Sequence, residues 1–302
     1  MSQIFSRGKL LLTSEYVVLD GAEALAVPTN WGQEFFFREQ QESDHQIFWT
    51  GKHQGQIWLT TKIDYKSWQI LESNNPDAAE FVLKTLKNCQ LLGSTKFDTN
   101  QNIEITSDLQ FPANYGLGSS STLMASLAKW ADVDAFVLNE KSLGGSGYDV
   151  AVAKANHSIL FKIENNLPTY KEIDFKPKFL EDLIFVHLNK KQDSREGIRL
   201  YRSKGKSVHL IAKFNHNTQQ VLKSNQLSEF SDLMIEHENR LSEFLELETT
   251  KKRFFDDCPS FIKSLGAWGG DFVLTSRFED YEKYFSKKGF ETIIPWNEMV
   301  YS

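Results

Sequence analysis

Two kinds of hydrophobic spacing divide the chain into predicted strands and predicted helices. Short apolar or alternating blocks predict strands in the first half at residues 16–19, 24–27, 34–38, 46–50, 56–61, 102–106 and 158–163. Asp20-Gly21, between the first two blocks, is a preferred tight-turn dipeptide, so these blocks predict a hairpin. Apolar residues spaced three and four apart predict helices over 78–91 and 119–131.

Helical spacing is more frequent in the second half. Strands are predicted at 183–188, 272–275 and 292–294, and helices at 207–222, 227–245 and 278–285. The polar, proline-containing stretch 165–177 is expected to be a connector. A chain of 302 residues exceeds an average domain, so we expect two domains, over 1–180 and 181–302.

Charge and cysteine content narrow the range of partners. Lys and Arg number 34 against 40 Asp and Glu, a formal net charge of -6, so no general attraction to nucleic acid is expected. A small anionic ligand in a local pocket is still compatible with this balance. Cys89 and Cys258 are the only cysteines and form no Cys-x-x-Cys pattern, which indicates neither a disulfide framework nor a zinc site.

The distribution of apolar runs predicts a cytoplasmic protein that binds no membrane. Leu10-Leu11-Leu12 is too short for the core of a signal peptide, since Thr13 ends it. No other run approaches the roughly 18 apolar residues of a membrane span. The two unpaired cysteines also fit a reducing compartment.

The strongest candidate for a ligand site is Gly116-Leu117-Gly118-Ser119-Ser120-Ser121, which follows Pro112 and opens the predicted helix over 119–131. Glycines let the backbone approach a ligand, and a helix start directs free N–H groups and its positive dipole end at the same place. A phosphate is therefore expected there, and a serine hydroxyl can also ligate Mg²⁺ beside a nucleotide. An ordinary capped turn is the alternative.

Three further glycine-rich segments stand at strand ends or helix starts. In Gly8-Lys9, a lysine within an apolar strand either reaches solvent or meets an anion, because burying it unpaired is costly. In Gly144-Gly145-Ser146-Gly147-Tyr148-Asp149, the carboxylate is placed to act as a base, or else bonds its own backbone in a turn. Segment 264–271, with Gly266, Gly269 and Gly270, is either a tight turn or a loop that closes over a ligand.

Several familiar motifs are excluded by their spacing. Gly205-Lys206-Ser207 ends like a P-loop, but the first glycine of that motif would fall at Leu200. Gly116-Leu117-Gly118 begins like a dinucleotide fingerprint, but Ser121 stands at the third glycine position. The seven histidines show no metal-ligand spacing, and His237 is expected to be a solvated or half-buried helix residue.

The order of these motifs resembles that of the GHMP kinases, which include galactokinase, homoserine kinase, mevalonate kinase and phosphomevalonate kinase. The resemblance spans nearly the whole chain, from Gly8-Lys9 and Glu15 through Pro112-x-x-x-Gly116-Leu117-Gly118-Ser119-Ser120 and Gly145-Ser146-Gly147-Tyr148-Asp149 to the late glycine segment. Gly147-Tyr148-Asp149-Val150-Ala151 is more narrowly similar to a bacterial group named for its Gly-Tyr-Asp-Ile-Ala (GYDIA) motif. Among enzymes of known reaction, Gly-Ser-Gly-Tyr-Asp is similar to phosphomevalonate kinase.

The resemblance implies a two-domain α+β fold that binds ATP and Mg²⁺. The N-terminal domain, 1–180, would be of the ribosomal-protein-S5-like kind and the C-terminal domain, 181–302, ferredoxin-like. Ser120 is the implied ligand of Mg²⁺ or phosphate. The residues implied to contact ATP are Pro112, Gly116, Leu117, Gly118, Ser119, Ser120, Ser121, Gly266, Gly269 and Gly270.

The catalytic residues that the resemblance implies are Asp149, Lys9 and Glu15. Asp149 would accept the proton of the acceptor hydroxyl or stabilise it electrostatically. Lys9 would lie near Asp149 and the γ-phosphate and offset the charge that develops during transfer. Glu15 keeps its family spacing from Lys9 and would support the site.

The chain also departs from the family pattern. Mevalonate kinases have a metal-binding Glu upstream of the Asp, whereas Glu140, the nearest upstream acid here, is in a different register. Arg7 stands where a proline is common and Ser14 where a glycine is common, and Trp268 interrupts the third glycine segment. These departures concern the second protein ligand of Mg²⁺ and the acceptor pocket.

The expected function is ATP- and Mg²⁺-dependent transfer of phosphate to a hydroxyl or phosphate of a small metabolite, with mevalonate or phosphomevalonate as the first candidates. A monomer or a homodimer is expected. Two alternatives stay open: an ATP-dependent diphosphomevalonate decarboxylase, and a catalytically idle nucleotide or metabolite sensor built on the kinase scaffold.

Overall fold

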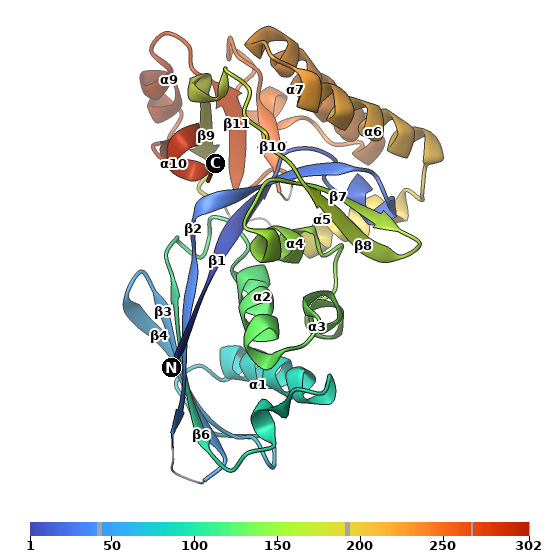
Figure 1. The fold of residues 1–302 in the computed structure, drawn as a ribbon. Helices are drawn as coiled ribbons and strands as arrows, with labels where there is room; N and C mark the ends of the chain where they lie inside the picture. Colours follow the sequence, from blue (N-terminus) through green and yellow to red (C-terminus); the bar gives the residue numbers. More distant parts are fainter. Residues whose placement is uncertain (41–43, 191–193, 267, 302) are drawn as a thin grey trace. The chain divides into compact units, whose positions relative to one another are not determined.

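The structure, a computed structural model, describes residues 1–40, 44–190, 194–266 and 268–301. The chain forms two compact units, whose elements are labelled in Figure 1. Unit 1 consists of Met1–Gly8, Trp31–Ala113 and Leu117–Asn156, and unit 2 of Lys9–Asn30, Asn114–Gly116 and His157–Ser302. Both units are discontinuous in sequence, and the predicted domain boundary near residue 180 stays a prediction.

Two long strands, β1 (Ser2–Leu11) and β2 (Ala24–Gln40), contribute residues to both units. The predicted hairpin of 16–19 and 24–27 is wrong, because Val17–Asp20 forms the 3-10 helix η1 and only the second block is a strand. Ser14 and Tyr16 have left-handed φ values of 67° and 63° and turn the chain before a strand can form. A buried apolar block of four residues does not by itself distinguish a strand from a helical turn.

Unit 1 contains a sheet with the strand order β5-β4-β3-β6-β2. Only β3 and β6 pair in parallel; the other neighbours in this order are antiparallel. The strands predicted at 34–38, 46–50, 56–61 and 102–106 are confirmed, whereas β5 was not predicted, because it has no buried face that would produce an apolar pattern. The bounds are β3 (Gln46–His53), β4 (Gln56–Asp64), β5 (Gln69–Ser73) and β6 (Asn102–Leu109).

The helices of unit 1 share one apolar core with this sheet. Phe37 of β2 stacks on Trp130, with the ring centroids 4.8 Å apart. Asn75 caps the first helix and Pro76 takes its first position, which agrees with a predicted start at 78 to within two residues. The predicted helix over 119–131 is confirmed. The bounds are α1 (Pro76–Leu91), η2 (Thr95–Phe97), α2 (Ser119–Ala131), α3 (Ala135–Ser142) and α4 (Tyr148–Ala155).

Unit 2 contains an antiparallel sheet in the order β10-β11-β9-β12. A hairpin of β7 and β8 adds to the first residues of β2. The predicted connector 165–177 is wrong over β8, because Asn165 and Asn166 both adopt positive φ and close a tight turn there. The bounds are β7 (Ile159–Glu164), β8 (Leu167–Glu172), β9 (Leu183–His187), β10 (Lys263–Leu265), β11 (Phe272–Ser276) and β12 (Ile293–Pro295).

Three helices of unit 2 follow the predictions at 207–222, 227–245 and 278–285, with shifts of up to three residues at the ends, whereas α5, α8 and α10 were not predicted. Helices and largely antiparallel strands are thus mixed in both units, in agreement with the α+β prediction. The S5-like and ferredoxin-like assignments stay predictions. The bounds are η3 (Leu180–Asp182), α5 (Ser194–Ser203), α6 (Val208–Lys223), α7 (Leu227–Leu245), α8 (Thr250–Phe254), α9 (Tyr281–Lys287) and α10 (Trp296–Met299).

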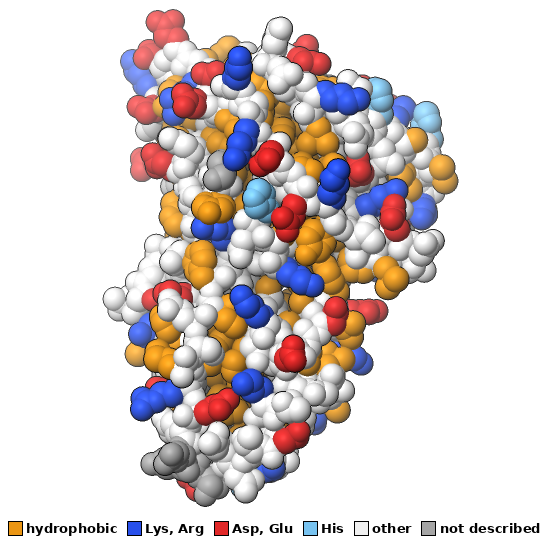
Figure 2. All heavy atoms as spheres, in the orientation of Figure 1, with side chains coloured by type: hydrophobic (Ala, Val, Ile, Leu, Met, Phe, Trp, Pro, Cys, Tyr) orange, Lys and Arg blue, Asp and Glu red, His pale blue; other side chains and the backbone are white. Residues whose placement is uncertain are grey.

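Two features of the helices and the surface bear on the expected partners. None of the helices in the described part of the chain is long and apolar enough to cross a membrane. On the face drawn in Figure 2, Lys and Arg side chains are interspersed with Asp and Glu side chains. This face therefore presents no continuous basic surface of the kind that nucleic-acid binding uses.

Candidate active site

The glycine loop predicted to bind phosphate is a left-handed turn that leads into α2. Gly116 and Gly118 have φ values of 68° and 90°, which other residues rarely adopt. Gly118 is the N-cap of α2 and makes no side-chain cap hydrogen bond. The first N–H groups of the helix therefore keep their capacity to bind an anion.

The three serines of this loop have different surroundings. Ser121 is buried, and its hydroxyl donates to the carbonyl oxygen of Gly118 at 2.7 Å. Ser119 is half-buried and Ser120 exposed, and neither hydroxyl bonds to a described residue. Mg²⁺ accepts oxygen ligands, so these two hydroxyls fit the metal that the resemblance implies. Across the described residues, no three His, Cys, Asp or Glu side chains are grouped as a metal site.

Lys9 contacts the same loop from β1. Its Nζ donates to the carbonyl oxygen of Gly116 at 2.9 Å, and the residue is only 9% exposed. The side chain of Lys9 therefore does not end in solvent, and its role at a site stays a prediction.

Asp271 also meets Gly116, although the sequence prediction did not include it. A Cβ added at Gly116 would collide with Oδ2 of Asp271, and one at Gly266 would lie 3.2 Å from it, so the buried carboxylate packs against both glycines. Gly266 and Gly269 have positive φ values of 73° and 83°, a backbone conformation that favours glycine. An acid directly after Gly269-Gly270 was the signal that could have identified Asp271.

Asp149 lies in the first turn of α4, behind Gly147, whose φ is 83°. It is half-buried, and its Oδ1 accepts the N–H of Val150 at 3.0 Å. Asp149 belongs to unit 1 and Lys9 to unit 2, so the expectation that they meet at one phosphate stays a prediction. In unit 1, Pro112 is half-buried, Leu117 is buried and Glu140 is exposed on α3.

Glu15 belongs to a buried cluster of titratable groups in unit 2. Its Oε1 lies 2.5 Å from Nζ of Lys263, and the residues are 3% and 0% exposed. Its Oε2 lies 3.1 Å from Nε2 of His237. Glu238 completes the cluster, with Oε1 3.5 Å from the same Nζ and 3.0 Å from the N–H of Ser264, which it accepts. Glu15 is therefore enclosed by partners from α7 and β10.

Burial and mutual charge set the protonation of this cluster. Burial disfavours the charged form of Glu15, but Lys263 and His237 outweigh it and lower the pKa of Glu15 to about 2. Burial lowers the pKa of His237 to about 4, with Lys263 acting in the same direction. Burial raises the pKa of Glu238 to about 7 against the attraction of Lys263. Near pH 7 the cluster thus holds one ion pair, a neutral His237 and a Glu238 that is about half protonated.

The expectation that His237 is solvated or half-buried is wrong. Its side chain is 0% exposed, and its Nε2 accepts the backbone N–H of Ser14 at 2.8 Å. Glu236-His237-Glu238 has the composition of a solvated helix face. Only the folded chain brings the Ser14 N–H and Lys263 to these side chains, so local sequence could not reveal the burial.

Solved structures with a similar fold match this chain over nearly its whole length. Methanococcus jannaschii mevalonate kinase has a TM-score of 0.68 at 18% identity, with 97% of this chain and 96% of that chain covered. Streptococcus pneumoniae phosphomevalonate kinase, in complex with phosphomevalonate and AMPPNP, has a TM-score of 0.70 at 14% identity, with 97% and 99% covered. This chain has the fold of small-molecule kinases.

The similarity in structure extends to a sugar kinase, whereas the sequence comparisons find no match. Lactococcus lactis galactokinase, complexed with galactose, has a TM-score of 0.63 at 12% identity, with 95% of this chain and 88% of that chain covered. No protein-family model matches the chain, and no curated protein matches it in sequence. The kinase fold is therefore visible in structure and not in overall sequence.

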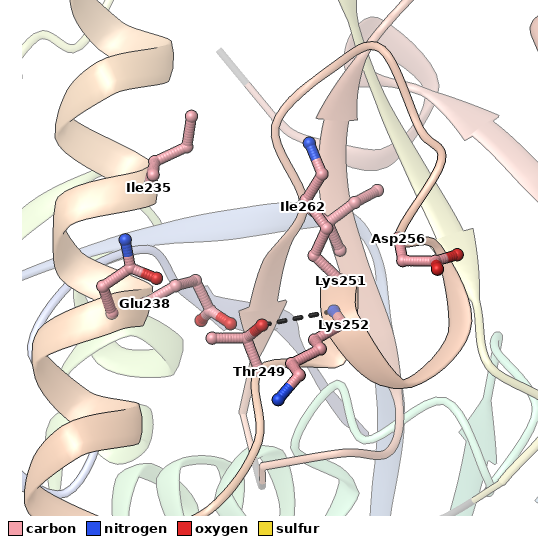
Figure 3. A pocket seen from close by; sticks show the side chains of 8 residues that line it. Ile235, Glu238, Thr249, Lys251, Lys252, Asp256 and Ile262 are labelled. Carbon is pink, nitrogen blue, oxygen red and sulfur yellow. Dashed lines mark hydrogen bonds between the residues drawn. The ribbon is translucent and has the colours of Figure 1, made fainter.

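A cavity of about 270 Å³ lies beside the buried cluster of unit 2 (Figure 3). In Figure 3, Glu238 projects from α7 toward Thr249 and Lys252, which lie on the opposite wall. None of the residues predicted for the site lines it. Its two lysines have partners within the protein: Lys251 donates to the carbonyl oxygen of Ser260 at 2.7 Å, and Lys252 pairs with Glu248 at 2.8 Å. Glu238 is the one residue of the buried cluster that lines this cavity.

Proposed function

We propose that this chain is an ATP- and Mg²⁺-dependent kinase of the GHMP superfamily that phosphorylates a small metabolite. The observation that carries the proposal is the contact of Lys9 with Gly116, in the loop that opens α2, within a fold shared with kinases over its whole length. The first N–H groups of α2 can bind phosphate, and the ammonium of Lys9 contacts Gly116, two residues before the N-cap of this helix.

Phosphoryl transfer needs mainly positioning and neutralisation of charge. In the proposed site, the first turn of α2 would hold the phosphates, and the hydroxyls of Ser119 and Ser120 would bind the metal. Bound Mg²⁺ would neutralise phosphate oxygens. Lys9 offsets charge that develops on the transferred group.

When the acceptor is a hydroxyl, the proposed reaction begins with transfer of its proton to Asp149; when the acceptor is a phosphate, an ionised phosphate oxygen attacks directly. The acceptor oxygen forms a bond to the γ-phosphorus, the bond from that phosphorus to the β–γ bridging oxygen breaks, and ADP leaves. Asp149 stands in the first turn of α4, and its Oδ1 accepts the N–H of Val150.

Mevalonate or phosphomevalonate is the proposed acceptor. Two structures with the same fold are named for these substrates, and residues 145–149 resemble the motif of phosphomevalonate kinase. The narrower placement in the Gly-Tyr-Asp-Ile-Ala group rests on residues 147–151. The proposal includes a cytoplasmic location and a monomer or homodimer.

ADP release tests the proposal, with Mg²⁺, ATP and a panel of mevalonate, phosphomevalonate, homoserine and sugars. One acceptor should be turned over, and Asp149→Ala should lower kcat by about 10²- to 10⁴-fold. Asp77→Ala is the matched control, because Asp77 is an exposed aspartate in the first turn of α1 in the same unit. If no acceptor is used and Asp149→Ala changes nothing, the kinase proposal is wrong. Release of CO₂ from diphosphomevalonate would identify the decarboxylase instead, and ATP binding without turnover would identify the sensor.

A further inference from the structure

The turn that carries Glu15 is held in a strained conformation. Ser14 and Tyr16, on either side of Glu15, both have left-handed φ values, 67° and 63°. Residues other than glycine persist in this region only where surrounding contacts fix them. Ser14 makes two such contacts: its N–H donates to Nε2 of His237 at 2.8 Å, and its hydroxyl donates to the carbonyl oxygen of Glu23 at 2.7 Å.

The ion pair of Glu15 with Lys263 connects this turn to the third glycine segment. The two charged atoms lie 2.5 Å apart in the interior of unit 2. Lys263 is the first residue of β10, and Gly266 follows directly after that strand ends at Leu265. The turn is therefore fastened to the strand from which the glycine segment starts.

Tyr16 connects the same turn to the middle of the glycine segment. Its hydroxyl oxygen accepts the backbone N–H of Trp268 at 2.8 Å, in the interior. A Cβ added at Gly197 of α5 would collide with this hydroxyl, so α5 packs closely against Tyr16. The indole N–H of Trp268 donates to the carbonyl oxygen of Glu248 at 3.2 Å. Glu15 and Tyr16, which are neighbours in sequence, thus hold this part of the chain at two residues, Lys263 and Trp268.

Asp271, the last residue of the glycine segment, contacts Gly116 in the loop before α2. The carboxylate of Asp271 packs against Gly116, and the carbonyl oxygen of Gly116 accepts the hydrogen bond from Lys9. All of these residues belong to unit 2. A shift of the segment would therefore move the carboxylate at the residue that Lys9 contacts.

We propose that Lys263 is a positioning residue: through Glu15, Tyr16 and residues 268–271, it sets where Asp271 and Gly116 stand relative to Lys9. A buried ion pair adds little stability, because desolvation offsets most of its attraction and apolar side chains of similar size do as well. The ion pair instead fixes the positions of its partners, because Nζ of Lys263 contacts Glu15, Glu238 and the carbonyl oxygen of Ser264 at the same time. The consequence for catalysis rests on the proposed kinase function, whereas the position of the segment does not.

Hydrogen exchange tests the position without any substrate. Lys263→Met and the double variant Glu15→Gln/Lys263→Met are compared with the wild type. The double variant removes both charges of the pair and so keeps the test open if the single variant fails to fold. Exchange at residues 14–18 and 265–271 should be faster by about tenfold or more in every variant that folds.

Lys251→Met is the control, because Lys251 lies in the same unit and donates to the carbonyl oxygen of Ser260 outside this chain of contacts. Exchange in the two segments should be unchanged in this variant. Wild-type exchange at 265–271 in the double variant would overturn the proposal.

The kinetic readout separates positioning from stability. If the pair only stabilised the fold, the folded double variant would keep the wild-type KM for ATP. If Lys263 has a positioning role, the KM for ATP of the double variant should rise by about tenfold, while that of Lys251→Met should be unchanged. An unchanged KM in the double variant would limit Lys263 to a structural role and overturn the proposal. If the wild type does not use ATP, the proposed function fails, and the exchange experiment still decides whether Lys263 positions the segment.

Discussion

The two units differ in what their interiors contain. In the described parts of the chain, every buried Lys, Asp and Glu belongs to unit 2: Lys9, Glu15, Glu238, Lys263 and Asp271. The core of unit 1 is aliphatic and aromatic, and its buried polar side chains are neutral. Apolar packing is non-directional, whereas buried charges require partners at fixed positions. The difference teaches that packing holds unit 1 together, while unit 2 also fixes charged groups in place.

The largest effect should come from removing one charge of the buried pair. Lys263→Met leaves Glu15 in the interior without its ammonium partner, which should lower the free energy of unfolding by about 3–5 kcal/mol. Adding Glu15→Gln should bring the total loss below about 2 kcal/mol, because the ionised carboxylate of Glu15 is removed and Glu238, whose pKa burial already raises, can hold a proton. Urea unfolding at pH 7 measures both. Additive losses would mean that the two residues do not act as a pair.

Leu86→Ala provides the comparison in unit 1. Leu86 is fully buried in the apolar core, and its truncation should lower the free energy of unfolding by about 2–5 kcal/mol. Since the core around it is apolar, this loss should be the same at pH 5 and pH 8. A pH-dependent loss would break the distinction between the two interiors.

The same distinction separates what the sequence could predict from what it could not. Apolar spacing located α1 and α2 to within two residues, because most of their buried side chains are apolar and recur at helical spacing. In unit 2 the bounds of α7 were also predicted, but not that His237 and Glu238 face inward. Ser14, which satisfies His237, lies 223 residues away in sequence, so no local pattern could supply that information.

At the candidate site, the sequence alone identified those residues whose role can be inferred from their neighbours in sequence. The glycine loop was recognisable from Gly116 and Gly118, and Lys9 from a lysine in an apolar strand. Lys263 has a similar local signal, because it follows Phe261-Ile262 and stands three residues before Gly266, and the criterion used for Lys9 would have singled it out. Its partner Glu15 could not be inferred, because pairing between distant segments depends on the fold.

A smaller effect should appear as a pH dependence. The pKa of Glu238 is raised from 4.5 to about 7, mainly by burial, so the folded protein holds this proton more tightly than the unfolded chain. This contribution is fully present below pH 4.5 and is lost as the pH rises through 7. Glu238→Gln should therefore gain about 2–3 kcal/mol relative to the wild type between pH 5 and pH 8.

The charged neighbours of Glu238 are present in both proteins and should largely cancel in this difference. They are Lys263 on β10, Glu15 on the turn, His237 on the same helix, and Lys251, Lys252 and Asp256 around the cavity. Glu243→Gln is the control, because Glu243 is an exposed residue of α7. Thermal unfolding across this pH range measures the difference in stability between each variant and the wild type. If this difference did not change with pH for Glu238→Gln, the carboxyl of Glu238 would not titrate in the interior.

The smallest effects are expected at helix caps, where the two units should not differ. Asn75 accepts the N–H of Ala78 at the start of α1 in unit 1, at 3.3 Å, and Ser207 accepts the N–H of Leu210 at the start of α6 in unit 2, at 3.2 Å. Replacing either with Ala should lower the free energy of unfolding by about 1 kcal/mol, equally at pH 5 and pH 8, because neither cap involves a charged partner. If the loss at Ser207 were several-fold larger, unit 2 would be fragile at ordinary backbone contacts as well, and its sensitivity could not be assigned to buried charge. Equal losses, unaffected by pH, would leave Lys263, Glu15 and Glu238 as the groups in which the two units differ.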